Sequence, residues 1–185
     1  MLRPNVILLD LGLPDIGGIE VTQRLRRSIQ TPIIILSIHA TTSDKLAALD
    51  AGADNYLTKP YVPGELFERI QTALLRPEVQ NTRVFQDSDL TVDLNRRHVQ
   101  IGNKQIQLTP NEYELLKVFV LNVGRLLAQL RLVREVWGEK MHDDEALQLL
   151  PATIGTLRQK LNCDPLYPRH ITTEPGVGYR LRTSL

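Results

Sequence analysis

The chain has 185 residues, of which 42% are hydrophobic and 23% are charged, and its formal net charge is +1. This length allows one large domain or two small ones, and the ordinary composition excludes a largely disordered chain. The single cysteine, Cys163, excludes a disulfide framework and a cysteine-rich zinc site, and it favours a reducing cytoplasmic compartment. The strongest apolar runs, at 6–9 and 33–36, are too short for a signal-peptide core or a membrane span. We therefore expect a cytoplasmic protein that makes no membrane contact.

Short apolar strands alternate with amphipathic helices in the first part of the chain. The strands are expected at 6–10, at 33–37 and near 55–60, and the helices at about 19–27, 43–51 and 64–75. Strands that are apolar on both faces and alternate with helices are typical of a parallel sheet in an α/β fold. We expect this domain to cover residues 1–75.

A polar segment with a proline, RPEVQNTR at 76–83, is expected to be a short linker to a second domain at 84–185. Strands are expected at 89–94 and 98–102, and a hairpin around Asn103. Thr109, Pro110 and Glu112 have the spacing of a helix cap, so a helix should cover 110–123. A second helix is expected at about 129–137, a third ending near Leu161, and a hairpin at 171–181. Strands, three helices and a closing hairpin are the order of a winged helix, which is an α+β fold.

Three polar residues follow the three strands of the first domain. Asp10 ends the first strand, Ser37 ends the second and Lys59 ends the third. The carboxyl ends of parallel strands meet at the edge of the sheet where such folds bind ligands. An aspartate can accept a phosphoryl group covalently, a lysine can neutralise the phosphoryl oxygens, and a serine can donate a hydrogen bond to them. The three together favour phosphoryl transfer over three unrelated surface residues.

The stretches LLDLGLPDIGGIE, PIIILS and DKLAALDAGADNYLTKPY resemble the receiver domain of two-component response regulators, which has a flavodoxin-like fold. This resemblance implies that Asp10 is the phosphoacceptor and that Lys59 contacts the phosphoryl group. It further implies that Ser37 and Tyr56 form the switch pair and that the peptide bond before Pro60 is cis. A sensor histidine kinase is the implied partner.

The resemblance also implies a homodimer through the receiver face of the OmpR/PhoB branch. The candidates for its ion pairs between subunits are Lys45, Asp54, Glu65 and Arg69.

The sequence departs from the receiver pattern at its start. Receivers begin with a further strand that ends in two acidic residues, and here only residues 1–5 precede the Asp10 strand. We therefore expect an N-terminally truncated receiver with a partial sheet. Mg²⁺, the cofactor that the family implies, needs more oxygen ligands than Asp10 and the Gly12 carbonyl supply, so the metal site is incomplete. We expect acetyl phosphate to label this chain only weakly.

The second domain resembles the OmpR/PhoB-type winged helix over LTPNEYELLKVF, LLAQLRLVREVWG, LRQKL and GVGYRL. The whole chain is most similar to the KdpE-type, potassium-responsive subgroup. The resemblance implies that the third helix reads promoter DNA in the major groove and that the closing hairpin contacts the backbone or the minor groove.

Helical periodicity separates a buried face of the third helix from a DNA-facing one. The expected core positions are Leu150, Ile154, Leu157 and Leu161. Thr153 and Thr156 are candidates for base edges, and Leu149 or Ala152 for a thymine methyl group. Arg158, Lys160 and Arg180 are candidates for phosphate contacts.

Pro151 is costly inside a helix but tolerated in its first turn, so we expect the reading helix to begin near Leu149 or Leu150, after a looser lead-in at 143–148.

The sequence leaves two alternatives to a phosphorylation-controlled regulator. One is a DNA-binding protein that works without phosphorylation because the acidic pair is missing. The other is an aspartate-nucleophile phosphatase acting through Asp10, but such enzymes carry a second aspartate where this chain has Gly12. We therefore expect no enzymatic activity.

Overall fold

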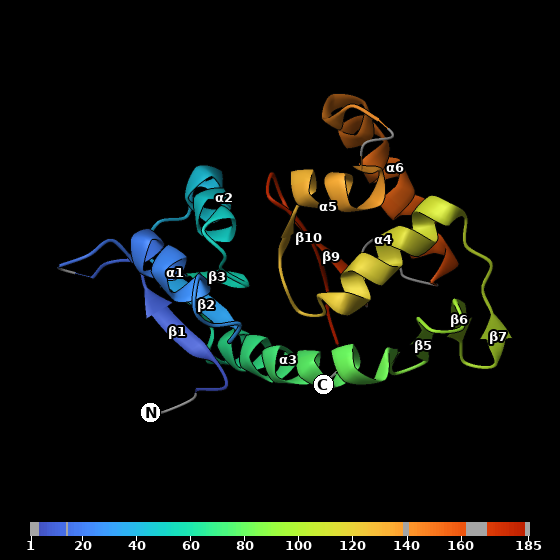
Figure 1. Cartoon of the computed structure of the whole chain (residues 1–185), viewed down its shortest axis with the longest axis horizontal. Helices are drawn as coiled ribbons and strands as arrows, with labels where there is room; N and C mark the ends of the chain where they lie inside the picture. The colour runs from blue at the N-terminus through green and yellow to red at the C-terminus, as the bar shows by residue number, and fades with distance from the viewer. Residues whose placement is uncertain (1–3, 14, 139–140, 162–169, 184–185) are drawn as a thin grey trace. The chain divides into compact units, whose positions relative to one another are not determined.

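The computed structural model describes residues 4–13, 15–138, 141–161 and 170–183, with the backbone alone for 75–81 (Figure 1). The chain divides into two compact units, and the boundary between them lies at Leu74–Leu75, inside a helix. No helix in the described ranges is long and apolar enough to cross a membrane.

The first unit is a three-stranded parallel sheet with helices, in the strand order β1-β2-β3. Its elements are β1 (Ile7–Asp10), α1 (Gly18–Arg26), β2 (Ile33–Ser37), α2 (Thr42–Asp50), β3 (Asn55–Thr58) and α3 (Pro63–Thr82). The strands form because their apolar residues are buried: Ile33, Ile34 and Ile35 of β2 are fully buried, and Leu9 and Tyr56 join the same core. The expected parallel α/β unit is confirmed.

The last helix of this unit is longer than the sequence predicts. Helix α3 continues through the expected linker to Thr82, with Pro77 inside it. A proline removes only one hydrogen bond of the helical ladder, and the surrounding glutamate, glutamine and arginine residues favour helix. The helix expected to end near residue 75 therefore extends further, and the segment expected as a linker at 76–83 is helical as far as Thr82.

The described residues of the second unit form two antiparallel sheets and three helices. The first sheet, in the order β4-β5-β6-β7, consists of β4 (Val84–Asp87), β5 (Leu90–Asp93), β6 (His98–Ile101) and β7 (Lys104–Gln105). The helices are α4 (Pro110–Leu121), α5 (Gln129–Val136) and α6 (Asp143–Lys160). The second sheet, in the order β8-β10-β9, consists of β8 (Leu127–Ala128), β9 (Ile171–Glu174) and β10 (Gly178–Leu181). Strands β4 and β8, with four and two residues, are additions to the elements that the sequence predicts.

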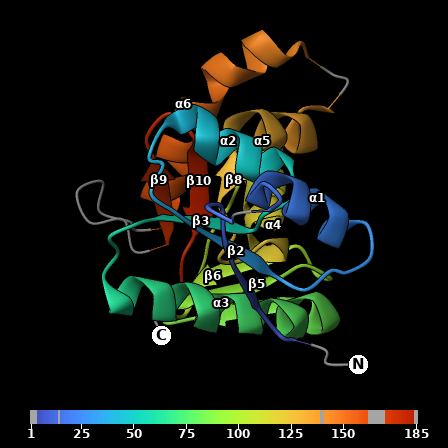
Figure 2. The ribbon, with the colours of Figure 1, turned by 90° about the vertical axis from the view of Figure 1, so that its left-hand side faces the viewer.

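Helices α4, α5 and α6 pack against one another around one hydrophobic core (Figure 2). The expected capping box is present: Thr109 Oγ1 accepts the Glu112 N–H, and the Glu112 carboxylate accepts the Thr109 N–H. Trp137 is buried in the core. Strands, helices and the β9–β10 hairpin follow in the predicted winged-helix order.

Helix α6 does not begin where Pro151 suggests. It is continuous from Asp143 to Lys160, with Pro151 inside it and exposed. Three acidic residues in its first turn stabilise the helix N-terminus, and Ala146 and Leu150 are fully buried in the core. This packing outweighs the lost hydrogen bond at Pro151, so the expected start near Leu149 or Leu150 is wrong.

Candidate phosphoryl and DNA-binding sites

The three strand-end residues of the first unit share one edge of its sheet. Asp10 is paired in register with Leu36, the residue before Ser37, and Ser37 is paired with Thr58, the residue before Lys59. The Lys59 N–H also donates to the Ser37 carbonyl at 2.7 Å. Parallel pairing therefore brings Asp10, Ser37 and Lys59 to neighbouring strand ends, although 49 residues separate the first from the last.

Asp10 is held by a lysine and a backbone amide. Lys59 Nζ forms a hydrogen-bonded ion pair with Asp10 Oδ2, and the Gly12 N–H donates to Asp10 Oδ1 at 2.9 Å. The hydrogen bond from Lys59, followed by that from Gly12, lowers the pKa of the Asp10 carboxyl below its ordinary value. Its side chain is 43% exposed. The result is an ionised, accessible carboxylate beside a fixed positive charge.

Ser37 and Tyr56 contact the same residue of the loop after β2. The buried Ser37 Oγ accepts the His39 N–H at 3.1 Å, and the buried Tyr56 hydroxyl donates to the His39 carbonyl at 2.8 Å. The Lys59–Pro60 peptide bond is cis. The two residues expected to act as a switch pair are therefore joined through the backbone of His39.

The described residues do not fit a Mg²⁺ site at Asp10. Both carboxylate oxygens of Asp10 already accept hydrogen bonds, and no group of three metal-ligating side chains occurs among the described residues. One carboxylate and a backbone carbonyl provide too few oxygen ligands for this ion.

One expected dimer residue has a different role. Asp54 is 2% exposed, and its Oδ2 accepts hydrogen bonds from Arg26 Nη2 at 2.7 Å and from the Ile33 N–H at 2.9 Å. A buried carboxylate needs such partners within its own unit and cannot reach another subunit. The assignment of Asp54 to the dimer face is therefore wrong. No sequence pattern singles out Arg26, since it is one of several arginines in the segment around α1.

The other three dimer candidates lie on the two helices expected. Glu65 and Arg69 pair with each other along α3 at 3.0 Å, and Lys45 is half-buried on α2.

The candidate base-contacting residues lie on the exposed side of α6. Leu149 is 44% exposed, Ala152 and Thr156 are exposed, and Thr153 is half-buried. Both threonine hydroxyls donate to backbone carbonyls of their own helix, which leaves their oxygens able to accept hydrogen bonds. The opposite face is the predicted core stripe, with each of Leu150, Ile154, Leu157 and Leu161 at most 2% exposed.

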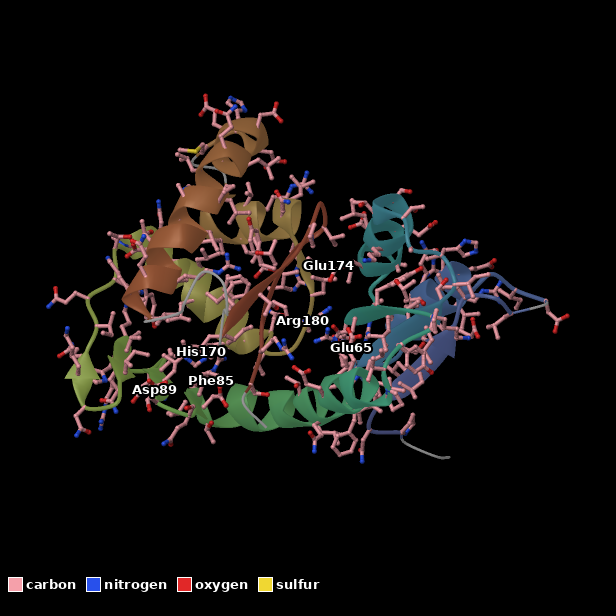
Figure 3. All side chains as sticks on the ribbon, turned by 180° about the vertical axis from the view of Figure 1, so that it is seen from behind. Glu65, Phe85, Asp89, His170, Glu174 and Arg180 are labelled. Carbon is pink, nitrogen blue, oxygen red and sulfur yellow. The ribbon has the colours of Figure 1, made fainter. Side chains whose placement is uncertain are left out.

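The basic residues expected at phosphates have partners or burial within the chain. Arg158 donates to the Ile171 carbonyl and to Thr173 Oγ1, and Lys160 Nζ lies 2.7 Å from Glu112 Oε2. Arg180, on β10 and labelled in Figure 3, is 4% exposed. The capping pattern identifies Glu112 as a helix-start residue, but nothing in the sequence connects it with Lys160.

Two family models match this chain. The response regulator receiver domain matches residues 1–71, and the C-terminal domain of transcriptional regulatory proteins matches residues 103–181. The KDP operon transcriptional regulatory protein KdpE of Escherichia coli K12 is 45% identical over 180 residues, which cover 96% of this chain and 79% of that protein. The chain belongs to the OmpR/PhoB family of response regulators, and it is of the KdpE type.

A second curated relative agrees with this family. KdpE of Mycobacterium tuberculosis CDC 1551 is 40% identical over 181 residues, covering 96% of this chain and 79% of that protein. Among solved structures, the response regulator DrrB of Thermotoga maritima matches with a TM-score of 0.48 and 27% identity, over 98% of this chain and 81% of that one.

The predicted family, subgroup and two-part fold are confirmed. This response regulator is a DNA-binding regulator of transcription in a two-component system, and its relatives are transcriptional regulators rather than enzymes.

Proposed function

We propose that Asp10 carries the phosphoryl group that controls this regulator, and that its DNA targets include an operon of the type named for its KDP relatives. The observation on which the proposal rests is the pairing of Asp10 with Lys59 at the edge of the parallel sheet. We further propose that the protein acts in the cytoplasm, with a sensor histidine kinase as phosphoryl donor and promoter DNA as target.

The chemistry at Asp10 is a displacement at phosphorus. An Asp10 carboxylate oxygen forms the new bond to phosphorus while the bond to the donor's nitrogen or oxygen breaks, and the donor leaves with the electron pair. The lowered pKa of Asp10 keeps the nucleophile ionised at neutral pH. Lys59 offsets the negative charge of the incoming phosphoryl oxygens, and the Ser37 hydroxyl, whose oxygen accepts from His39, has its hydrogen available to donate to one of them.

We expect the extent of phosphorylation to be low in the 185-residue chain. Receiver domains of this family generally use Mg²⁺ for phosphorylation, and Asp10 with the Gly12 carbonyl offers such an ion too few oxygen ligands. No step is assigned to the metal.

On the DNA side, we propose that α6 lies in the major groove with Thr153 and Thr156 at base edges. Leu149 and Ala152 are exposed on the same helix and suit thymine methyl groups.

The receiver face that we propose for a homodimer keeps Lys45, Glu65 and Arg69, without Asp54.

The test combines phosphate labelling with DNA binding. The wild-type chain and Asp10→Ala are incubated with radiolabelled acetyl phosphate, with and without Mg²⁺, and then footprinted on the promoter region upstream of their own gene. A weak, base-labile label that is lost in Asp10→Ala, together with tighter DNA binding by the labelled fraction, supports the proposal. Equal footprints of both proteins without any label would favour a DNA-binding protein that works without phosphorylation, and label retained in Asp10→Ala would exclude Asp10.

A further inference from the structure

We propose that Arg158 and Lys160 are positioning residues for DNA recognition rather than ligands of DNA phosphates. They hold the end of helix α6 against α4 and against the β9–β10 hairpin, which is the wing of the winged helix. This inference rests on DNA binding by α6 but not on phosphorylation of Asp10. Both residues lie in the last turn of the helix, where basic side chains would otherwise be natural phosphate ligands.

Arg158 joins the reading helix to the wing. Its Nε and Nη2 donate to the Ile171 carbonyl at 3.0 and 2.8 Å, and Nη2 also donates to Thr173 Oγ1 at 2.8 Å. Both acceptors belong to β9, which lies at the edge of the sheet with the order β8-β10-β9. The guanidinium also lies 5.8 Å from the ring centroid of Tyr179 on β10. One side chain therefore contacts both strands of the hairpin, and the planar fork of an arginine suits this arrangement better than a lysine would.

Lys160 joins the same turn to the start of α4. Its Nζ lies 2.7 Å from Glu112 Oε2, and that oxygen also accepts the Thr109 N–H at 2.7 Å. The Glu112 side chain is 5% exposed, whereas that of Lys160 is 36% exposed. Burial raises the pKa of Glu112, but hydrogen bonds from Lys160, Thr109 and Thr156 outweigh this and leave it below its ordinary value. The buried carboxylate is therefore charged at neutral pH and needs the lysine as its partner.

The contacts of Arg158 with β9 and of Lys160 with Glu112 tether opposite sides of α6, and the hydrophobic core already holds this helix along one face. Leu150, Ile154 and Leu157 anchor that face. The polar contacts of Arg158 and Lys160 fix the distances from the last turn of α6 to β9 and to α4. Apolar packing alone does not set these distances. Side chains that read bases must be held to within a fraction of an ångström, so loosening either tether should weaken specific binding more than non-specific binding.

Salt dependence separates a tether from a phosphate ligand. Each cation that neutralises a phosphate releases counterions and contributes about 1 to the slope of log affinity against log salt. A cation that stays paired within the protein contributes nothing to this slope. The probes are a duplex that the wild-type chain selects from a random-sequence pool, and a scrambled duplex of the same length.

The variants are Lys160→Met, Glu112→Gln and Arg158→Lys, with Lys104→Met on β7 as a control for the loss of one exposed charge. We expect Lys160→Met to bind the selected duplex about tenfold more weakly, with an unchanged salt slope and little change on the scrambled duplex. Glu112→Gln should lose affinity in the same direction, and the double variant should lose no more than Lys160→Met alone. If Lys160 were a phosphate ligand, Glu112→Gln would free it and binding would hold or improve.

Arg158→Lys retains the positive charge but not the planar guanidinium group. If Arg158 holds α6 against β9, the variant should bind the selected duplex more weakly. If Arg158 contacts a DNA phosphate, the variant should keep nearly full affinity. Amide exchange of the DNA-free chain is a second readout that needs no DNA and guards against variants that merely unfold. Faster exchange confined to β9 in Arg158→Lys, and to the last turn of α6 in Lys160→Met, is the expected result. A salt slope lower by about 1 in Lys160→Met, or exchange unchanged in both variants, would overturn the proposal.

Discussion

Arg26 Nη2 lies 2.7 Å from Asp54 Oδ2, and the same oxygen accepts the Ile33 N–H at 2.9 Å. Arg26 also donates to the carbonyls of Gly52, Ile29 and Thr31. One arginine thus joins the end of α1 to the segments that lead into β2 and β3. This ion pair is an internal tie of the first unit, where the family resemblance implied a contact between subunits.

Replacement of Asp54 by alanine should destabilise the first unit by about 3 kcal/mol, because removal of one partner leaves a largely buried arginine without its carboxylate. Urea denaturation followed by circular dichroism measures the change. Glu20→Ala is the matched control, since it breaks an exposed pair with Arg24 and should cost at most about 1 kcal/mol. Loss of dimer without loss of stability in Asp54→Ala would restore the dimer-face interpretation.

Lys59→Met should raise the pKa of Asp10 towards the ordinary aspartate value, because the hydrogen bond from Lys59 is the largest cause of its lowering. The lowered pKa contributes stability that is present above the unfolded-state pKa of about 3.9 and is lost as the pH falls through the folded-state value. The stability difference between wild type and Lys59→Met should therefore shrink on acidification. A carboxyl NMR titration of Asp10 measures the pKa directly, with Arg24→Met as the control. An unchanged Asp10 titration in Lys59→Met would show that the ion pair is absent in solution.

Pro151→Ala should stabilise the second unit by roughly 2 kcal/mol. A proline inside a helix costs about 3 kcal/mol relative to alanine, and part of this is offset because proline restricts the unfolded chain. Pro151 is exposed, so little packing is lost. Thermal and urea unfolding give the change in stability. A neutral or destabilising result would mean that α6 is not helical through Pro151 and that the reading helix starts later.

Gly178→Ala should disrupt the second sheet, because a β-carbon at this position would collide with the carbonyl oxygen of Leu127. Gly178 is paired with Ala128 in the register between β10 and β8, so the strands must separate to relieve the collision. We expect a lower melting temperature and weaker DNA binding. Gly155→Ala, where no atom lies within 4 Å of the added carbon, is the control and should melt no lower than wild type. Equal melting temperatures for the two variants would contradict the close approach.

Sequence patterns alone were enough to predict the two-part fold, the strand-end residues Asp10, Ser37 and Lys59, and the core stripe of α6. These features depend on local periodicity and on the residue at the end of each strand, and the sequence shows both directly. The capping box at Thr109 was predictable for the same reason, since its two residues are three positions apart.

The partners of the charged side chains, by contrast, become visible only in the folded chain. Asp54 and Arg26 are 28 residues apart, and Lys160 and Glu112 are 48 apart, so no local pattern connects them. A charged residue in a sequence looks equally suited to solvent, to DNA or to an internal partner. Burial and a partner of opposite charge select among these, and both exist only once the chain is folded. Packing likewise overrode the local preference of Pro151, because the core residues on both sides of it hold α6 along one face.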